Sequence, residues 1–146
     1  MNRAALSVAI TMILVLTGCG SGNKSSTPQG TSLTVTGNVT YSGADSGSLI
    51  ISIDTRTNPV CPQDTPVLYK MVPTVTPASF PYPYVFTNLA ADTYYVYAFF
   101  DVNGDAGLPP CPKADDICGR VGPEVVDDAT PTATVDVPLD IVGCQQ

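Results

Sequence analysis

The stretch T-Y-Y-V-Y-A-F-F, residues Thr93 to Phe100, is apolar on both faces when it is extended. Aromatic and β-branched residues favour strands because their side chains pack well on a pleated surface. An extended run that is apolar on both faces is typical of a strand in the middle of a sheet. One face carries Tyr94, Val96, Ala98 and Phe100, and the other carries Tyr95, Tyr97 and Phe99.

Segments with a single apolar face surround this stretch. Alternation of apolar and polar residues predicts further strands at 33–41, 82–86 and 132–142, and the chain is expected to return as a strand at 49–54. Bounding prolines predict a short edge strand at 67–72. The turn at 43–47 predicts that the first two strands form a hairpin. Residues 101–130 are expected to form a long loop. Because no segment has a sustained helical period, the sequence predicts an all-β, antiparallel β-sandwich of six to seven strands.

Part of this pattern resembles the transthyretin-like and carboxypeptidase-regulatory-like family of Ig-like sandwiches. The resemblance lies in V-T-G-N-V at 35–39 and in Y-V-F-T-N-L at 84–89, which leads through a turn to Y-Y-V at 94–96. The family usually has a glycine before that tyrosine, whereas the turn here is A-A-D-T at 90–93. Members serve as adhesion, binding and accessory domains, so the resemblance implies a fold rather than a function.

The N-terminus has the features of an export signal. Arg3 supplies a positive charge, and V-A-I-T-M-I-L-V-L at 8–16 is shorter than the roughly 20 apolar residues that a membrane-spanning helix needs. The run ends in Leu16-Thr17-Gly18-Cys19, which resembles the lipobox of bacterial lipoproteins. That resemblance implies lipidation of Cys19 and cleavage just before it. An ordinary secretory signal is the alternative.

These features divide the chain into a removed signal peptide (1–18), a lipidated cysteine with a flexible tether (19–31) and one β-sandwich domain (32–146). The tether is small and polar and has no periodicity. An aspartate after the cysteine would resemble an inner-membrane retention signal, and Gly20 stands there instead. The resemblance therefore implies a lipid-anchored protein of the cell envelope, on the outer membrane where the host has one.

The mature chain is acidic. Loss of Arg3 with the signal peptide leaves five basic residues against 13 acidic residues, which is a formal charge of −8. Such a chain is repelled by a phosphate backbone, so nucleic acid is not an expected partner. Anionic lipid repels it too, and membrane attachment must therefore come from the acyl chains on Cys19.

The chain has five cysteines, and lipid on Cys19 leaves four in an oxidising compartment. Two disulfides are expected, and the preferred pairing is Cys111 with Cys118 and Cys61 with Cys144. A bridge between the loops of Cys61 and Cys111 is the alternative. The spacing of the cysteines contains no close C-x-x-C pair and the chain has no histidine, which disfavours zinc.

An acidic loop follows the central strand. Its sequence D-V-N-G-D-A-G at 101–107 resembles the opening D-x-N-x-D of EF-hand and dockerin calcium loops, in which alternate oxygen ligands converge on a hard cation. The resemblance implies a structural Ca²⁺ held by Asp101, Asn103, Asp105 and the carbonyl of Gly107. Asp115 or Asp116 is the nearest further ligand, and Asp116 is included in the expected set. Alanine and proline stand where the EF-hand has its glycine and glutamate, and an exposed acidic turn without metal is the alternative.

Chemistry for catalysis is not evident. Histidine is absent, the cysteines are committed and no serine has a G-x-S-x-G context, so the protein is not expected to be an enzyme. A non-enzymatic structural or protein-interaction module, with an envelope protein or glycan as partner, is the expected function. The alternative is a carbohydrate- or peptide-binding module that uses a tyrosine-bearing sheet face, with Tyr82, Tyr84, Tyr95 and Tyr97 as its ligand-binding residues.

Overall fold

The computed structural model describes residues 32–58, 65–107, 111–142 and 144. Within these ranges the chain forms strands and one short 3₁₀ helix, and it contains no α-helix. The elements are β1 (Leu33–Thr40), β2 (Gly47–Asp54), β3 (Leu68–Val75), η1 (Pro77–Ser79), β4 (Tyr82–Leu89), β5 (Asp92–Asp101), β6 (Ile117–Val126), β7 (Thr132–Thr134), β8 (Val137–Pro138) and β9 (Ile141–Val142).

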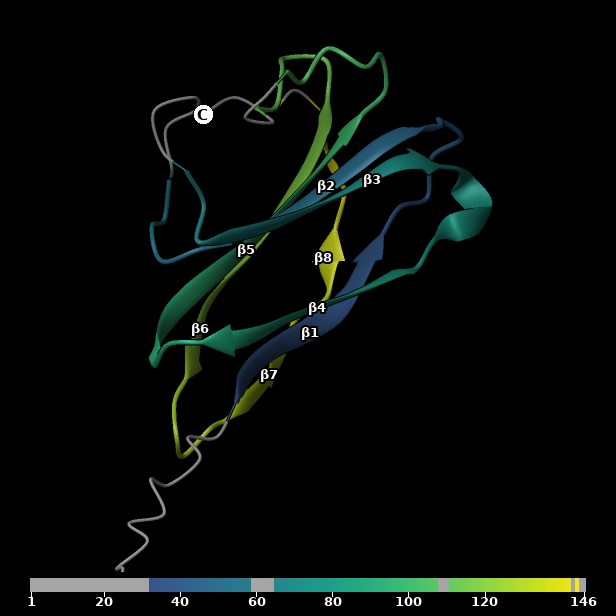
Figure 1. Ribbon diagram of the computed structural model, residues 1–146. Coiled ribbons are helices and arrows are strands. Elements are labelled where there is room, and N and C mark those ends of the chain that lie inside the picture. Colours follow the sequence, from purple (N-terminus) through teal and green to yellow (C-terminus); the bar gives the residue numbers. More distant parts are fainter. Residues whose placement is uncertain (1–31, 59–64, 108–110, 143, 145–146) are drawn as a thin grey trace, which may run out of the picture.

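The strands form two packed sheets (Figure 1). The smaller sheet has the order β4-β1-β7, and β8 also pairs with β1. The larger sheet has the order β3-β2-β5-β6-β9. The predicted all-β sandwich is therefore confirmed.

The position of β5 explains its unusual sequence. This strand lies in the middle of the larger sheet, between β2 and β6, as its two apolar faces predict. Its inner face packs into the main core together with residues from both sheets. The buried members of this core are Leu33, Val35, Val39, Leu49, Ile51, Ile53, Val75, Tyr84, Phe86, Leu89, Tyr94, Val96, Ala98, Phe100, Val126, Ala133, Val135, Val137 and Leu139.

The predicted hairpin of the first two strands is wrong. β1 belongs to the smaller sheet and pairs with β4, β7 and β8, whereas β2 belongs to the larger sheet and pairs with β3 and β5. The segment between them crosses from one sheet to the other. Both strands direct an apolar face to the same core from opposite sides, so alternation along each strand is the same as in a hairpin.

The predicted long loop at 101–130 is also corrected, because β6 lies inside it. Gly119, Gly122 and Pro123 interrupt the apolar alternation of this strand in the sequence. The strand nevertheless pairs with β5 on both sides of a register shift between Tyr94 and Val96. Glycine and proline are accommodated at such irregularities in a sheet.

The last predicted strand, at 132–142, is divided into three. β7 and β8 run parallel to β1, and β9 then pairs with β6 in the other sheet. A Cβ on Gly37 would lie 1.7 Å from the carbonyl oxygen of Val135, so a glycine is required where the chain passes closest to β1. Within the described ranges the sandwich consequently has nine strands and a mixed smaller sheet, in place of six or seven antiparallel strands.

The predicted signal peptide, lipobox and tether lie outside the described residues. Among the residues that are described, no helix has the length and hydrophobicity needed to cross a membrane.

Candidate metal centre

Asp101 ends β5 and organises the acidic loop that follows. Its Oδ1 accepts the backbone N–H groups of Gly104 (2.7 Å) and Asp105 (3.2 Å), and its Oδ2 accepts that of Ala106 (3.3 Å). Gly104 has a φ of 80°, a conformation that glycine adopts without strain. The loop therefore folds back around a carboxylate that is only 5% exposed.

Asp116 approaches the same place from the segment just before β6. Its side chain is 1% exposed, and its Oδ2 accepts the backbone N–H of Lys113 at 2.7 Å. Its Oδ1 is buried without a hydrogen-bond partner, the only buried side-chain atom of that kind in the described parts of the chain. Burying a polar group without a partner costs free energy, and a native structure rarely leaves one in that state unless an ion or water satisfies it.

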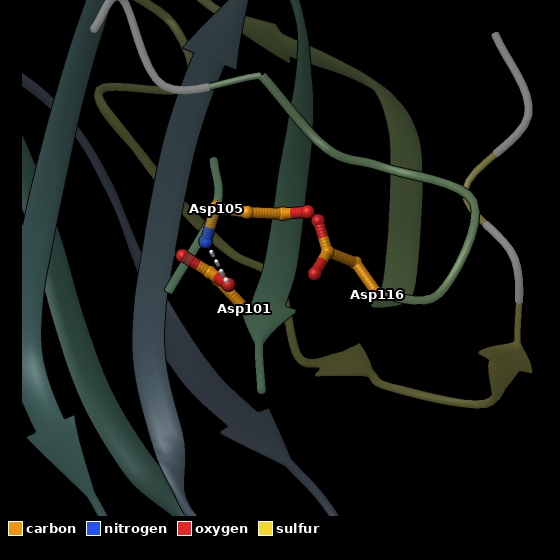
Figure 2. Close-up of side chains that lie close together, drawn as sticks. All are labelled: Asp101, Asp105 and Asp116. Carbon is orange, nitrogen blue, oxygen red and sulfur yellow. Dashed lines mark hydrogen bonds between the residues drawn. The ribbon is translucent and has the colours of Figure 1, made fainter. Parts of the chain in front are cut away.

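Asp101, Asp105 and Asp116 form a cluster whose nearest carboxylate oxygens all lie within 4.8 Å of one another. Figure 2 shows the carboxylates of Asp105 and Asp116 directed toward each other, with Asp101 beside them. Asp105 is exposed, whereas the other two are buried. The cluster is thus open to solvent on one side and closed on the other.

The surroundings of Asp116 disfavour its negative charge. Burial raises the pKa of Asp116, and the hydrogen bond from the Lys113 backbone only partly offsets that rise. The charges of Asp101, Asp105 and Asp115 raise the pKa of Asp116 further. A bound cation would favour the ionised form of Asp116 and would satisfy its free oxygen.

Two other predicted ligands, Asn103 and Gly107, are not members of this carboxylate cluster. The Asn103 amide donates to Asp115 Oδ2 at 2.6 Å, and its oxygen accepts the N–H of Asp105 at 3.2 Å. Asn103 therefore closes the loop onto the segment before β6. Gly107 is exposed with a φ of 72°, and the ligand role of its carbonyl stays a prediction.

The chemistry of the cluster fits a hard cation. Its donors are carboxylate oxygens, which Ca²⁺ and Mg²⁺ prefer, and the chain has no histidine. The cluster brings together three of the five predicted metal residues. The sequence offers Asp116 as a neighbour of the loop, but the burial of its side chain is a property of the fold.

The predicted disulfide pairing is wrong. Cys118 bonds to Cys144, with Cα atoms 5.6 Å apart, and Cys111 is itself disulfide-bonded. The physical reason is the path of the C-terminus, because β9 pairs with the start of β6 through Ile117–Val142 and Cys118–Ile141. Cys61 lies outside the described residues.

A small apolar cluster lies beside the acidic loop, apart from the main core. It consists of the buried residues Ile50, Phe99 and Ala106, against which Cys118 and Cys144 pack, and we call it the second cluster. Ile50 and Phe99 are opposite each other on β2 and β5. The acidic loop contributes Ala106, so the loop is part of the covering of the larger sheet's outer face.

The predicted tyrosine-bearing face does not exist as one surface. Tyr84 is buried in the core, where its hydroxyl donates to the carbonyl of Val135, and burial raises its pKa. Tyr82 packs against the same core from the smaller sheet. Tyr95 and Tyr97 lie on the opposite face of β5, where the Tyr97 hydroxyl bonds to the carbonyls of residues 56 and 57.

Comparison with protein-family models, curated proteins and solved structures finds no match for this chain.

Proposed function

We propose that this chain is a lipid-anchored, non-enzymatic module of the cell envelope whose acidic loop holds a structural Ca²⁺. The observation that carries the calcium site is Asp116 Oδ1, a buried oxygen without a hydrogen-bond partner on a carboxylate that lies beside two further carboxylates. A buried carboxylate is normally paired with a cation or neutralised. The ion pair found among the described residues, Arg56 with Asp54, lies elsewhere.

Calcium is the ion that this site suits best. Ca²⁺ accepts six to eight oxygen ligands in a flexible arrangement, whereas Mg²⁺ demands near-ideal octahedral geometry and releases its waters reluctantly. The loop supplies carboxylates from two separate segments, with Asn103 and Asp115 alongside. Water completes the coordination on the exposed side, next to Asp105.

The calcium site is tested by thermal unfolding of the mature chain carrying Cys19→Ser. At a Ca²⁺ concentration of about 100 times Kd, binding stabilises the folded state by about 2.7 kcal/mol, so the midpoint rises relative to chelator. Asp116→Asn removes this difference, and Asp128→Asn, which changes an exposed acidic residue elsewhere, keeps it. Identical midpoints of the parent chain with Ca²⁺ and with chelator would exclude the site.

The envelope location rests on the lipobox resemblance at Leu16-Thr17-Gly18-Cys19 and on the cysteine chemistry. The Cys118–Cys144 disulfide and the bonded state of Cys111 support an oxidising compartment. The two-sheet architecture is compatible with the transthyretin-like family, and we propose membership on that basis. We place the anchor in the outer membrane, because Gly20 follows the cysteine.

The anchor is tested in intact cells. The natural chain should fractionate with membranes, and Cys19→Ser should move it to the soluble extracytoplasmic fraction. A Cys19→Ser chain that stays with the membranes would contradict attachment through lipid on this cysteine.

The interaction role rests on β3, which is an edge strand, as predicted. Four exposed apolar side chains fall within five consecutive residues at its start: Val67 (47% exposed), Leu68 (41%), Tyr69 (48%) and Met71 (40%). An edge strand presents unpaired backbone groups to which a partner's extended segment can add. A different envelope protein is favoured over a second copy, because two chains of charge −8 repel each other.

A photo-crosslinking residue at Tyr69 tests this surface in intact envelopes. Adducts with another protein are expected at position 69, and not at Thr134, an exposed position on the smaller sheet. Equal adducts at both positions, or an adduct only with a second copy of the chain, would contradict the proposed partner surface.

A further inference from the structure

The acidic loop and the Cys118–Cys144 disulfide meet at the second cluster. Ala106 is 5% exposed and belongs to this cluster, and both of its backbone polar groups are engaged. Its N–H donates to Asp101 Oδ2 at 3.3 Å, and its carbonyl accepts the N–H of Cys111 at 3.0 Å. Any ion that fixes Asp101 therefore also fixes the residue that covers Ile50 and Phe99.

The disulfide also adjoins this cluster. Cys118 and Cys144 pack against it, and their bond holds the C-terminal segment beside β6. Apart from that bond, β9 is joined to β6 through two residue pairs, Ile117 with Val142 and Cys118 with Ile141. So short a strand is weakly held by backbone pairing alone.

Asp116 connects the two features along the chain. It lies two residues before Cys118, and β6 begins between them at Ile117. A shift of the start of β6 would therefore displace the Asp116 carboxylate, whose Oδ1 is buried without a hydrogen-bond partner. The ion site and the disulfide thus share the second cluster and the first residues of β6.

We infer, on the basis of the proposed calcium site, that the Cys118–Cys144 disulfide controls the cation affinity of the acidic loop. In the oxidised chain the second cluster and the start of β6 are ordered before the ion binds. In the reduced chain the ion must order them itself, and that entropic cost weakens binding. Because coupling between two sites is reciprocal, the bound ion in turn protects the disulfide from reduction.

The reaction on the disulfide is thiol–disulfide exchange. A dithiol reductant donates two electrons and two protons, the bond between Cys118 and Cys144 breaks to give two thiols, and the reductant closes to a cyclic disulfide. No other bond of the domain needs to change. The oxidation state of this one pair then sets the concentration of Ca²⁺ at which the loop becomes ordered.

Calorimetric titration with Ca²⁺ tests the inference on the mature chain with Cys19→Ser. The oxidised chain is compared with the same chain carrying Cys118→Ala and Cys144→Ala, and a loss of about tenfold in affinity is expected, within the usual range of coupling between sites. Tyr84→Phe is the matched control, because it removes a buried hydrogen bond in the main core, away from the loop. It should lower the unfolding midpoint without changing the Ca²⁺ affinity.

A second measurement does not depend on the variants. The rate at which dithiothreitol reduces Cys118 and Cys144 is followed by thiol labelling and mass spectrometry, with Ca²⁺ and with chelator. Reduction about tenfold slower with Ca²⁺ supports the inference, by the reciprocity of the coupling. Equal rates, or equal affinities of the oxidised chain and a folded double variant, would overturn it while leaving the calcium site intact. Failure of the oxidised chain to bind Ca²⁺ would overturn both proposals.

Discussion

The two apolar clusters of this domain differ in what closes them. In the described parts of the chain, the main core has nineteen buried residues contributed by both sheets, and its members lie between those sheets. The second cluster has three buried residues there, on the outer face of the larger sheet, beside a disulfide and an acidic loop. Hydrophobic stabilisation is roughly proportional to the apolar area buried, so it is large for the first cluster and small for the second.

This difference separates the parts of the domain that apolar burial stabilises from those that need other chemistry. The main core is stabilised chiefly by its large buried apolar area. The second cluster buries little apolar area, and a disulfide and the loop that carries the acidic cluster adjoin it. Substitutions in the two regions should therefore respond differently to calcium.

The largest expected effect is in the main core. Phe100 is fully buried and packs edge-on against Tyr41 and Phe80. Phe100→Ala should lower the free energy of unfolding by about 4 kcal/mol, because it removes an aromatic side chain and leaves a cavity. Denaturant unfolding should give the same loss with Ca²⁺ and with chelator. A loss that depends on Ca²⁺ would show that the two regions are not separate.

The next effect concerns Asp54, which is buried and bonds to the Arg56 side chain at 2.7 and 2.8 Å. Burial raises the pKa of Asp54, but the hydrogen bonds from Arg56 outweigh it and hold the pKa below its ordinary value. A carboxyl with a depressed pKa stabilises the fold above its ordinary pKa, and that stabilisation is lost as the pH falls through the lower folded value.

Asp54→Asn should accordingly cost about 2 kcal/mol at neutral pH, the usual contribution of hydrogen bonds to a charged group. The difference between the variant and the parent chain should shrink as the pH falls below 3.8, the ordinary pKa of the carboxyl. Urea unfolding at a series of pH values measures it. A difference that is constant with pH would mean that the charge of Asp54 contributes nothing.

Asp116→Asn should have opposite effects with and without calcium. In chelator it should stabilise the domain by about 1 kcal/mol, because it removes a buried negative charge while its carbonyl can still accept the Lys113 N–H. With Ca²⁺ the variant should gain no stability, unlike the parent chain. Calorimetric melting under both conditions measures the two effects. Destabilisation in chelator would indicate that the carboxylate is satisfied without an ion.

The smallest effect is expected in the second cluster. Ile50→Val should cost about 0.8 kcal/mol, because it removes one methyl group from a buried side chain. The matched change Ile51→Val removes the same group from the main core, one residue along β2. Only Ile50→Val should also weaken Ca²⁺ binding. Equal effects of the two variants on calcium affinity would mean that the second cluster does not support the loop.

Local sequence was sufficient for several of the single strands. The two apolar faces of Thr93–Phe100 predict a central strand, and β5 is central. Alternation predicts β1, β4 and the buried positions up to Leu139. In each case the side chain's preference and the tertiary environment agree.

The pairing of elements could not be predicted in the same way. Alternation specifies which face of a strand is apolar, and it does not specify which strand lies beside it, so β1 and β2 were expected in one hairpin. Gly119, Gly122 and Pro123 interrupt the apolar alternation, so β6 was not predicted from the sequence. Ile141 is 51% exposed, contrary to the alternation, because the chain has crossed to the other sheet by that point. The same crossing decides the partner of Cys118.

The candidate metal site likewise contains residues that local sequence brings together and one that depends on strand pairing. Asp101 and Asp105 are close in the sequence, and a loop motif is enough to bring them together. Asp116 joins them only because β6 returns antiparallel to β5, and the burial of its carboxylate depends on that return. The sequence motif was enough to predict the acidic loop, whereas the pairing of β6 with β5 is what brings Asp116 Oδ1 beside that loop.

The two ends of β5 have a consequence for a protein held by its N-terminus. Ser32 contacts Asn88 at the end of the sandwich where β4 leads into β5, and Asp101 is at the other end of β5. Ten extended residues span about 33 Å. For a chain anchored as proposed, the acidic loop is then at the end of the sandwich farther from the anchored terminus, where the ions and reductants of the compartment can reach it.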